Sequence, residues 1–228
     1  MKVSVGFAPA ERVAAPVGVV IDVLRATSTI CQALAAGWDR VVCVAEIEDA
    51  RALAGPGVAL AGERHNVPID GFDFGNSPRE FASAPGGDTV VLTTTNGTRA
   101  LLTAAERCET VLVGALLNLA AVVGAVAARG EDVAILCAGV EGAFAIDDAY
   151  VAGRIAAALS GTLDDSAIAA ARLAAAFDGA EAGIAGGVSA ANIRDANLAE
   201  DIPWCARESV LDLVPRVVER SERSVVVA

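Results

Sequence analysis

The stretch VGVVIDVLRATSTI, residues 17–30, decides the fold that we predict for this chain. Its β-branched apolar run ends at Asp22, a turn that carries Arg25 follows, and hydroxyl residues then lead into a helical composition that stops at Gly37. Such a pattern is typical of a buried strand that runs into a helix. Asp22 and Arg25 therefore belong at the carboxyl end of a strand, where open α/β sheets bind their ligands.

Strand signals alternate with helical patterns along most of the chain, and no Pro- or Ser-rich linker interrupts them. This alternation predicts a three-layer α/β/α fold with a mainly parallel or mixed sheet, built as one unit or as two similar lobes. We expect a single domain over residues 1–228. The expected strands are 17–21, 40–44, 58–61, 89–92, 110–113 and 133–137. The expected helices are 29–36, 47–53, 98–106, 119–128, 148–159, 166–177 and 206–220.

Composition excludes several classes of protein. The formal charge of −12, from 17 basic and 29 acidic residues, argues against a nucleic-acid surface, which needs clustered Lys and Arg. Five cysteines, an odd number with no CxxC pair, are typical of reduced thiols in the cytoplasm. The N-terminus shows no apolar signal segment. Residues 110–128 are uncharged, but they divide into a strand, an Asn118 cap and a helix, so we expect no membrane segment.

Two further properties bound the chemistry and the assembly. The mean hydropathy of +0.53 leaves an apolar surplus, from which we expect a homo-oligomer, with a symmetric dimer as its form. The sequence contains one histidine, so sites built from several histidines are excluded. Catalysis must then rest mainly on carboxylates, arginines, amides and hydroxyls, and a hard metal ion could take part.

Polar clusters follow the first two motif-bearing strands. Asp22 could bind Mg²⁺ or act as a nucleophile, and Arg25 offers a planar fork to phosphate or sulfonate oxygens. The alternative for this pair is a surface ion pair. After strand 58–61, Glu63 could ligate a metal or act as a general base, Arg64 could contact an anion, and His65 could be an acid or base. A solvated loop is the ordinary alternative for a lone histidine.

Three more clusters follow later strands or open helices. Asn76 precedes a Ser-Pro helix start, whose backbone N–H groups could face an anion, although the segment could simply turn the chain. The run TTTNGTR, residues 93–99, follows a strand and lacks the Walker spacing, yet it is rich enough in hydroxyl and amide groups to favour a phosphate cradle. Asp147 and Asp148 open a helix after strand 133–137, where they could bind Mg²⁺ or merely complement the helix dipole. The candidate residues of the cradle are Thr94, Thr95, Asn96, Gly97 and Arg99.

These motifs, in this order, resemble the 2-phosphosulfolactate phosphatase family, a magnesium-dependent family associated with coenzyme M synthesis. The resemblance runs over about residues 19–153, with a weaker echo in DIPWCARESVLDLVP, and five motifs in register make it specific. It implies hydrolysis of the phosphate ester of a small sulfonated or carboxylated acid in an α/β/α fold. The chain departs from the family in its acidic pair, which is Asp147-Asp148 rather than Glu-Asp. The segments that carry the resemblance are IDVLRATSTI, AGER, GFDFGNSPREF, TTTNGTRAL, CAG and EGAFAIDDAYVAGRI.

We therefore expect Mg²⁺ held by Asp22 with Asp147 or Asp148, and Glu63 close by. Arg25 would bind the phosphoryl oxygens, assisted by Thr95 and Asn96, while Arg64 or Arg99 would hold the acid end of the substrate. One rival mechanism uses Asp22 as a covalent nucleophile, but Leu24 stands where haloacid-dehalogenase-type phosphatases have a second Asp. A second rival is a non-catalytic module that binds a phosphorylated metabolite, although carboxylates would oppose such binding.

Overall fold

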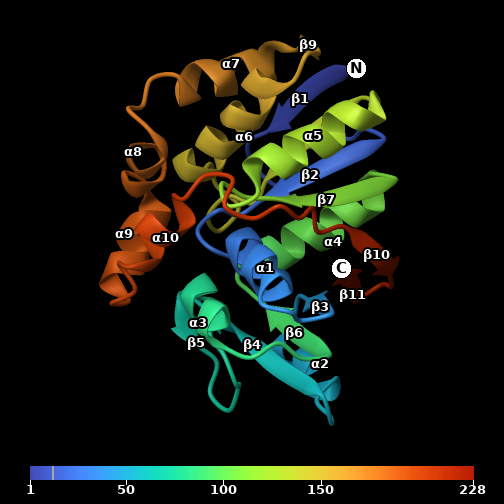
Figure 1. Cartoon of the computed structure of the whole chain (residues 1–228), viewed down its shortest axis with the longest axis vertical. Coiled ribbons are helices and arrows are strands. Elements are labelled where there is room, and N and C mark those ends of the chain that lie inside the picture. Colours follow the sequence, from blue (N-terminus) through green and yellow to red (C-terminus); the bar gives the residue numbers. More distant parts are fainter. Residues whose placement is uncertain (12) are drawn as a thin grey trace.

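The computed structural model describes residues 1–11 and 13–228, and its chain folds around two β-sheets (Figure 1). The first sheet has five parallel strands in the order β7-β2-β8-β1-β9. Every residue of its interior strand β2 is buried, as expected for a parallel strand covered on both faces. Its strands are β1 (Lys2–Gly6), β2 (Val17–Ile21), β7 (Thr110–Gly114), β8 (Val133–Cys137) and β9 (Thr162–Leu163).

The second sheet has six strands in the order β10-β11-β3-β6-β4-β5. Its centre, β3-β6-β4, is parallel, and the flanking pairs are antiparallel. The sheet is therefore mixed. Its strands are β3 (Arg40–Val44), β4 (Val58–Arg64), β5 (Val67–Pro68), β6 (Thr89–Thr93), β10 (Val217–Arg220) and β11 (Ser224–Val227).

Helices separate and cover the two sheets. One apolar core joins the first sheet to α5, α6 and α7, and another joins its opposite face to α1, α4 and the second sheet. Figure 1 shows α1 and α4 between the two sheets and α2 on the far side of the second. The predicted α/β/α class is thus confirmed, with two sheets. The helices are α1 (Ala26–Ala35), α2 (Ile47–Ala52), α3 (Pro78–Ser83), α4 (Gly97–Arg107), α5 (Leu119–Arg129), α6 (Ile146–Ala158), α7 (Asp165–Ala174), α8 (Ala180–Ala185), α9 (Val188–Asp195) and α10 (Asp201–Cys205).

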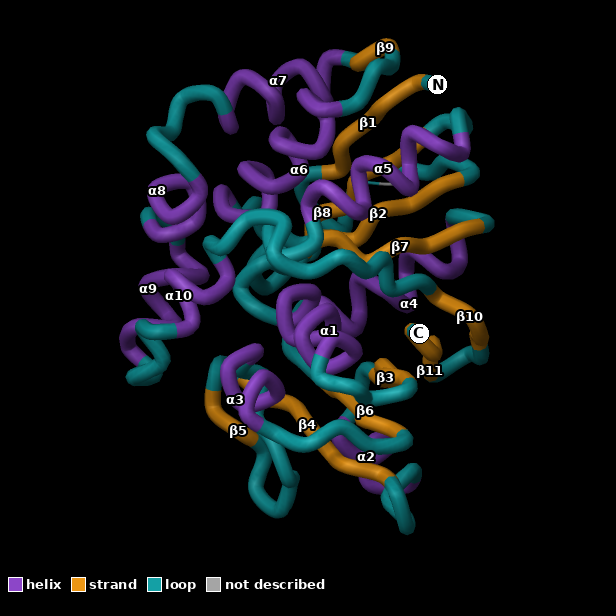
Figure 2. Tube along the Cα trace, viewed as in Figure 1, coloured by secondary structure: helices purple, strands orange, loops and turns teal. Residues whose placement is uncertain are grey.

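The segment after α10 is extended, so the helix predicted over 206–220 is wrong. It runs beside the end of β7 and then enters the second sheet as β10 (Figure 2). Backbone N–H groups of Ser209 and Leu211 donate to the carbonyls of Leu116 and Leu117, and Val113 donates to Pro215. Proline also removes a helix donor at position 215. The segment joins the two sheets, which a local spacing of Val and Leu cannot reveal.

The region singled out as uncharged, 110–128, divides into β7 and α5, as predicted. Asn118 occupies the N-cap position, but its side chain accepts from Ala115 N and donates to the carbonyls of Val113 and Leu213. Among the described helices, none combines the length and apolar character needed to cross a bilayer. All five cysteines are free and buried.

Candidate active site

Polar loops from both sheets meet in one cavity of about 420 Å³. Its lining includes residues at or within three positions of the carboxyl ends of β2, β4, β6 and β8, as expected where parallel strands end. Helix α9 supplies a further wall. The predicted residues that line the cavity are Asp22, Arg25, Glu63, His65, Asn76, Thr95 and Asn96. The predicted residues outside the lining are Arg64, Thr94, Gly97, Arg99, Asp147 and Asp148.

The carboxylates of Asp22, Asp147 and Glu63 form an acidic centre at the cavity. Burial, together with the charges of Asp147 and Glu63, raises the pKa of Asp22 to about 7. Asp22 Oδ1 accepts a long hydrogen bond of 3.3 Å from Ala26 N. Asp147 lies behind Ser189, whose Oγ donates to Asp147 Oδ1 at 2.9 Å, and burial raises the pKa of Asp147 to about 6. Carboxylates that repel one another in this way favour a bound cation.

Glu63 fixes the loops around the acidic centre. Its carboxylate accepts from Asn66 N at 2.7 Å, from Thr95 N at 2.8 Å and from Thr95 Oγ1 at 3.0 Å. These bonds connect the turn after β4 with the turn after β6. Glu63 therefore holds the cavity wall in shape besides adding negative charge.

Asp148 differs from Asp147 because both of its oxygens are already used. Oδ1 accepts from Val23 N at 2.9 Å and Oδ2 from Gly139 N at 3.0 Å. The side chain thus ties the turn after β2 to the turn after β8. Among the described residues, no group of three or more His, Cys, Asp or Glu side chains could together hold a metal ion. The three-aspartate site stays a prediction, and the geometry favours Asp22 and Asp147 over Asp148 as its members.

Arg25 is buried and paired within the cavity wall. Its Nη1 donates to Asp201 Oδ2 at 2.8 Å, and both side chains are only 1% exposed. Its Nη2 donates to Asn66 Oδ1 at 3.3 Å. Arg25 Nε and Asn76 Oδ1 are buried without a hydrogen-bond partner. Two polar groups in this state beside a cavity indicate a wall that is completed by a ligand or by water.

Only some residues of the hydroxyl-rich run after β6 line the cavity, and others lie at the start of α4. Thr95 and Asn96 line the cavity, and Asn96 Oδ1 accepts from Glu141 N across its mouth. Thr94 instead faces Thr98, whose backbone N–H donates to Thr94 Oγ1 at 3.1 Å at the start of α4. Gly97 lies so close to the β2 turn that a Cβ there would be 2.5 Å from Asp22 Oδ2. Only part of the predicted phosphate cradle therefore reaches the cavity.

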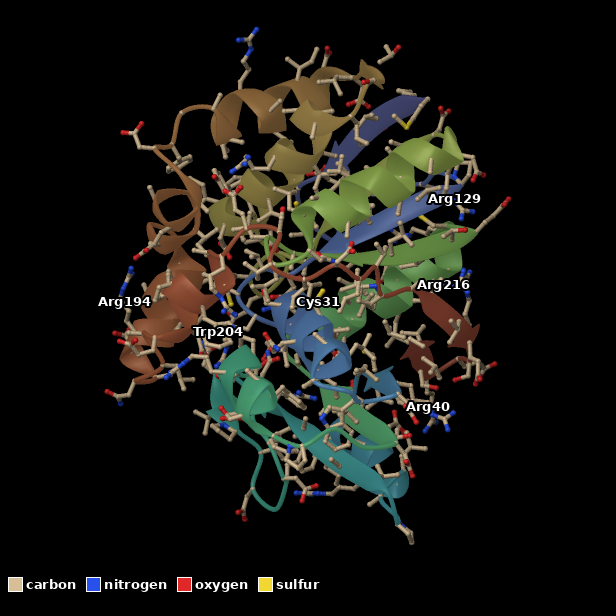
Figure 3. All side chains as sticks on the ribbon, in the orientation of Figure 1. Cys31, Arg40, Arg129, Arg194, Trp204 and Arg216 are labelled. Carbon is tan, nitrogen blue, oxygen red and sulfur yellow. The ribbon has the colours of Figure 1, made fainter. Side chains whose placement is uncertain are left out.

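Two predicted anion contacts are engaged elsewhere. Arg64 donates to the carbonyls of Glu63 and Ala45 and to Thr93 Oγ1. Arg99 pairs with Glu46 at the surface. Figure 3 shows Arg40, Arg129 and Arg216 on the opposite side of the molecule from Arg194 on α9. Within the described lining, Arg25 is the sole guanidinium.

The mouth of the cavity carries a weaker contact. His65 Nδ1 lies 3.2 Å from Glu141 Oε1, and the two side chains are 73% and 65% exposed. An exposed pair of this kind contributes little to stability. His65 therefore lies at the rim, beside the site but away from its buried carboxylates.

Several lining residues were not predicted from the sequence. Ser189, Asn192 and Asp195 occupy one face of α9, at spacings of three residues, inside the Ala- and Gly-rich region that offers no motif. Asp201, behind Arg25, lies in the segment DIPWC, the weak C-terminal echo of the family pattern. That echo was the one available signal.

The cavity is acidic overall. Four carboxylates line it, those of Asp22, Glu63, Glu141 and Asp195, against one guanidinium that Asp201 already neutralises. Carboxylate and amide oxygens are the ligands that Mg²⁺ prefers, and it commonly uses only one or two protein carboxylates. The residues present thus fit a divalent cation.

Strand-end loops around an acidic cavity define the chain as an α/β enzyme with a site for a small molecule. The family model for 2-phosphosulpholactate phosphatase matches residues 6–220, and the chain belongs to this family. A Thermotoga petrophila protein is 37% identical over 95% of both chains, and one from Thermus thermophilus is 37% identical over 94% of both. A Caldanaerobacter subterraneus protein is 44% identical over 64% of this chain and 62% of its own length. Each of the three is named probable 2-phosphosulfolactate phosphatase.

Proposed function

We propose that the protein hydrolyses 2-phosphosulfolactate to sulfolactate and inorganic phosphate with the help of Mg²⁺. Family membership supports the reaction, and the names of the relatives support the substrate. The same resemblance associates the enzyme with coenzyme M synthesis. We further propose that it acts in the cytoplasm as a homodimer, which light scattering of the purified protein would test.

The observation that carries the proposal is the charge of the cavity. A phosphate monoester dianion would meet four lining carboxylates and a single arginine that is already paired. Coulomb repulsion in such a partly buried site is stronger than in water, so tight binding of the dianion needs additional positive charge. This imbalance also disfavours the alternative of a metal-independent module that binds a phosphorylated metabolite.

The reaction is a displacement at phosphorus. A water oxygen forms the new P–O bond, the ester P–O bond breaks with its electron pair on the leaving oxygen, and a water proton ends on that oxygen. A Mg²⁺ ion held by Asp22 and Asp147 would polarise the phosphoryl group and orient the water. Arg25 donates to the phosphoryl oxygens and stabilises charge in the transition state, assisted by Thr95 and Asn96. Glu63 keeps Thr95 in position through its two hydrogen bonds.

The test measures phosphate release from 2-phosphosulfolactate and from other small phosphorylated acids, with Mg²⁺ and with EDTA. We expect release with metal only, and an Asp22→Asn variant that stays folded but loses at least about 10²-fold in kcat. Asp165→Asn, a change of the same type in the first turn of α7, is the matched control. Full activity of the Asp22 variant, or tight binding without turnover by the wild type, would overturn the proposal.

A covalent route through Asp22 makes a different prediction. It requires an aspartyl-phosphate that can be trapped at Asp22 with borohydride during turnover. We expect no adduct at this residue, because Asp22 would hold the metal ion and water would be the nucleophile. A labelled Asp22 peptide would replace the water mechanism with the covalent one while leaving the substrate unchanged.

A further inference from the structure

The carboxylate of Asp201 is buried beside the cavity and hydrogen-bonded on both oxygens. Asp201 is the first residue of α10, and its side chain is 1% exposed. Oδ2 accepts from Arg25 Nη1 at 2.8 Å, and Oδ1 accepts from Ser77 Oγ at 2.6 Å. Arg25 belongs to the turn after β2 and Ser77 precedes α3 (Figure 1), so one carboxylate connects three distant segments.

Stability alone gives a poor account of this arrangement. The desolvation cost of a buried ion pair offsets most of its attraction, and apolar replacements of similar volume are often as stable. The pair does, however, control geometry. Arginine is flexible, but its guanidinium is planar, so two fixed hydrogen bonds define the orientation of the whole group. Asp201 and Asn66 provide two such bonds to Arg25.

The fixed guanidinium keeps donors for the cavity. Arg25 has five N–H donors, two of which are used by Asp201 and Asn66. Its Nε is without a partner, and the residue lines the cavity. An arginine held in this way loses less conformational entropy when it binds an oxyanion than a free one would.

We propose that Asp201 is a positioning residue that holds Arg25 in the orientation needed for phosphoryl transfer, with Ser77 fixing the carboxylate in turn. The inference rests on the proposed function. It assigns to α10, beyond the segment that carries the main sequence motifs, a direct effect on the rate of the reaction. It also explains why Asp201 is used on both oxygens: a carboxylate with one free oxygen could rotate and take Arg25 with it.

The first test compares two serine variants of the same helical segment. Ser77→Ala removes the hydrogen bond to Asp201, whereas Ser83→Ala, at the other end of α3, removes only an exposed bond to Arg79 O. For Ser77→Ala we expect kcat to fall about tenfold, the value of a buried bond to a charged group, with Mg²⁺ affinity unchanged. Ser83→Ala should keep the wild-type kcat. Equal kcat values for the two variants would overturn the inference.

The second test is a double-mutant cycle on kcat, measured below the unfolding temperature of every variant. Asp201→Asn keeps the size of the side chain and should lower kcat about 10²-fold, as a misplaced catalytic group does. If Asp201 acts through Arg25, then adding Asp201→Asn to Arg25→Ala costs nothing further. A double variant whose loss in kcat equals the product of the two single losses would indicate that Asp201 acts separately from Arg25, and would overturn the inference.

The outcomes separate this inference from the function on which it rests. A wild-type protein that releases no phosphate with Mg²⁺ from any small phosphorylated acid overturns both. If the wild type is active but the losses in kcat of the two single variants multiply in the double variant, only the positioning role of Asp201 is overturned. If Asp201→Asn does not fold, the comparison of the two serine variants decides.

Discussion

Gly97→Ala is the change whose effect follows most directly from the structure. Gly97 is the first residue of α4, where the helix touches the turn after β2. A Cβ at this position would lie 2.4 Å from the Cβ of Ala26 and 2.5 Å from Asp22 Oδ2. Neither neighbour is the end of a long flexible side chain, so the backbone of α4 or of the turn must move. Gly97 is then needed for close approach, a reason different from the phosphate cradle predicted from the sequence.

The size of the effect can be bounded with a matched control. Overpacking of this kind costs about 1–3 kcal/mol. Gly124 lies exposed within α5, and a Cβ there meets nothing within 4 Å, so Gly124→Ala should stabilise by about 0.4–1 kcal/mol. The two variants should therefore differ by about 1.4–4 kcal/mol in the free energy of unfolding. For a chain of this length the difference in Tm is on the order of 10 °C.

Urea unfolding followed by circular dichroism measures the free energy of unfolding, and phosphate release measures kcat. The added methyl group would push against Asp22 Oδ2, an atom of the proposed active site. The kcat of Gly97→Ala should therefore also fall, by about 10²-fold for a shift of Asp22 near 1 Å. Gly124→Ala should keep the wild-type kcat. A Gly97→Ala protein as stable and as active as Gly124→Ala would refute the close approach of α4 to Asp22.

Three smaller predictions concern residues outside the acidic centre. Arg99→Met removes a half-exposed pair with Glu46, so stability should change by less than about 1 kcal/mol and KM should stay constant; a large rise in KM would return Arg99 to the substrate. Arg64→Met breaks three hydrogen bonds to Glu63, Ala45 and Thr93, and urea unfolding should show a loss of roughly 1–3 kcal/mol. Asp164→Ala removes the side-chain cap of α7 and should cost about 1 kcal/mol. Burial acts to raise the pKa of Asp164, but hydrogen bonds from Ser166 and Ala167 hold it below its usual value. That cap therefore stabilises above about pH 4 and its contribution is lost as the pH falls, which unfolding at pH 7 and pH 3 would detect.

The strands that carry the site could be predicted because their signal is local. For β2 and β8 the predicted and observed bounds agree, since each is a short apolar run between turn residues. Strand β1 escapes prediction, because its five residues also include Ser and Gly and its partners are 130 or more residues away in sequence. The prediction for the extended segment that joins the sheets is wrong for the same reason, since its hydrogen-bond partners are also far away in sequence.

The site shows the same limit at the level of single side chains. Asp22, Glu63 and Thr95 could be predicted because each lies at or just beyond the carboxyl end of a strand, and these strand ends meet. Arg64, the last residue of β4, and Arg99, in the first turn of α4, lie near the same edge, yet their guanidinium groups are engaged by acceptors from other loops. Asp201 escapes prediction because its partners, Arg25 and Ser77, are 176 and 124 residues away. A motif thus indicates where the backbone of a residue lies, but not which way a long side chain points.

The division between the two sheets gives the cavity its chemistry. The first sheet contributes Asp22 and Arg25, the second contributes Glu63 and Thr95, and α9 and α10 contribute Ser189 and, behind the wall, Asp201. Three buried charged side chains are each fixed by a bond to a residue of another segment: Glu63 to Thr95, Asp147 to Ser189 and Arg25 to Asp201. A change in Ser189 or Asp201 should therefore alter the reaction through the charged side chain that each residue holds. Conversely, a ligand that binds the cavity links all three parts of the fold and should stabilise them together, since whatever binds only the native state raises its stability.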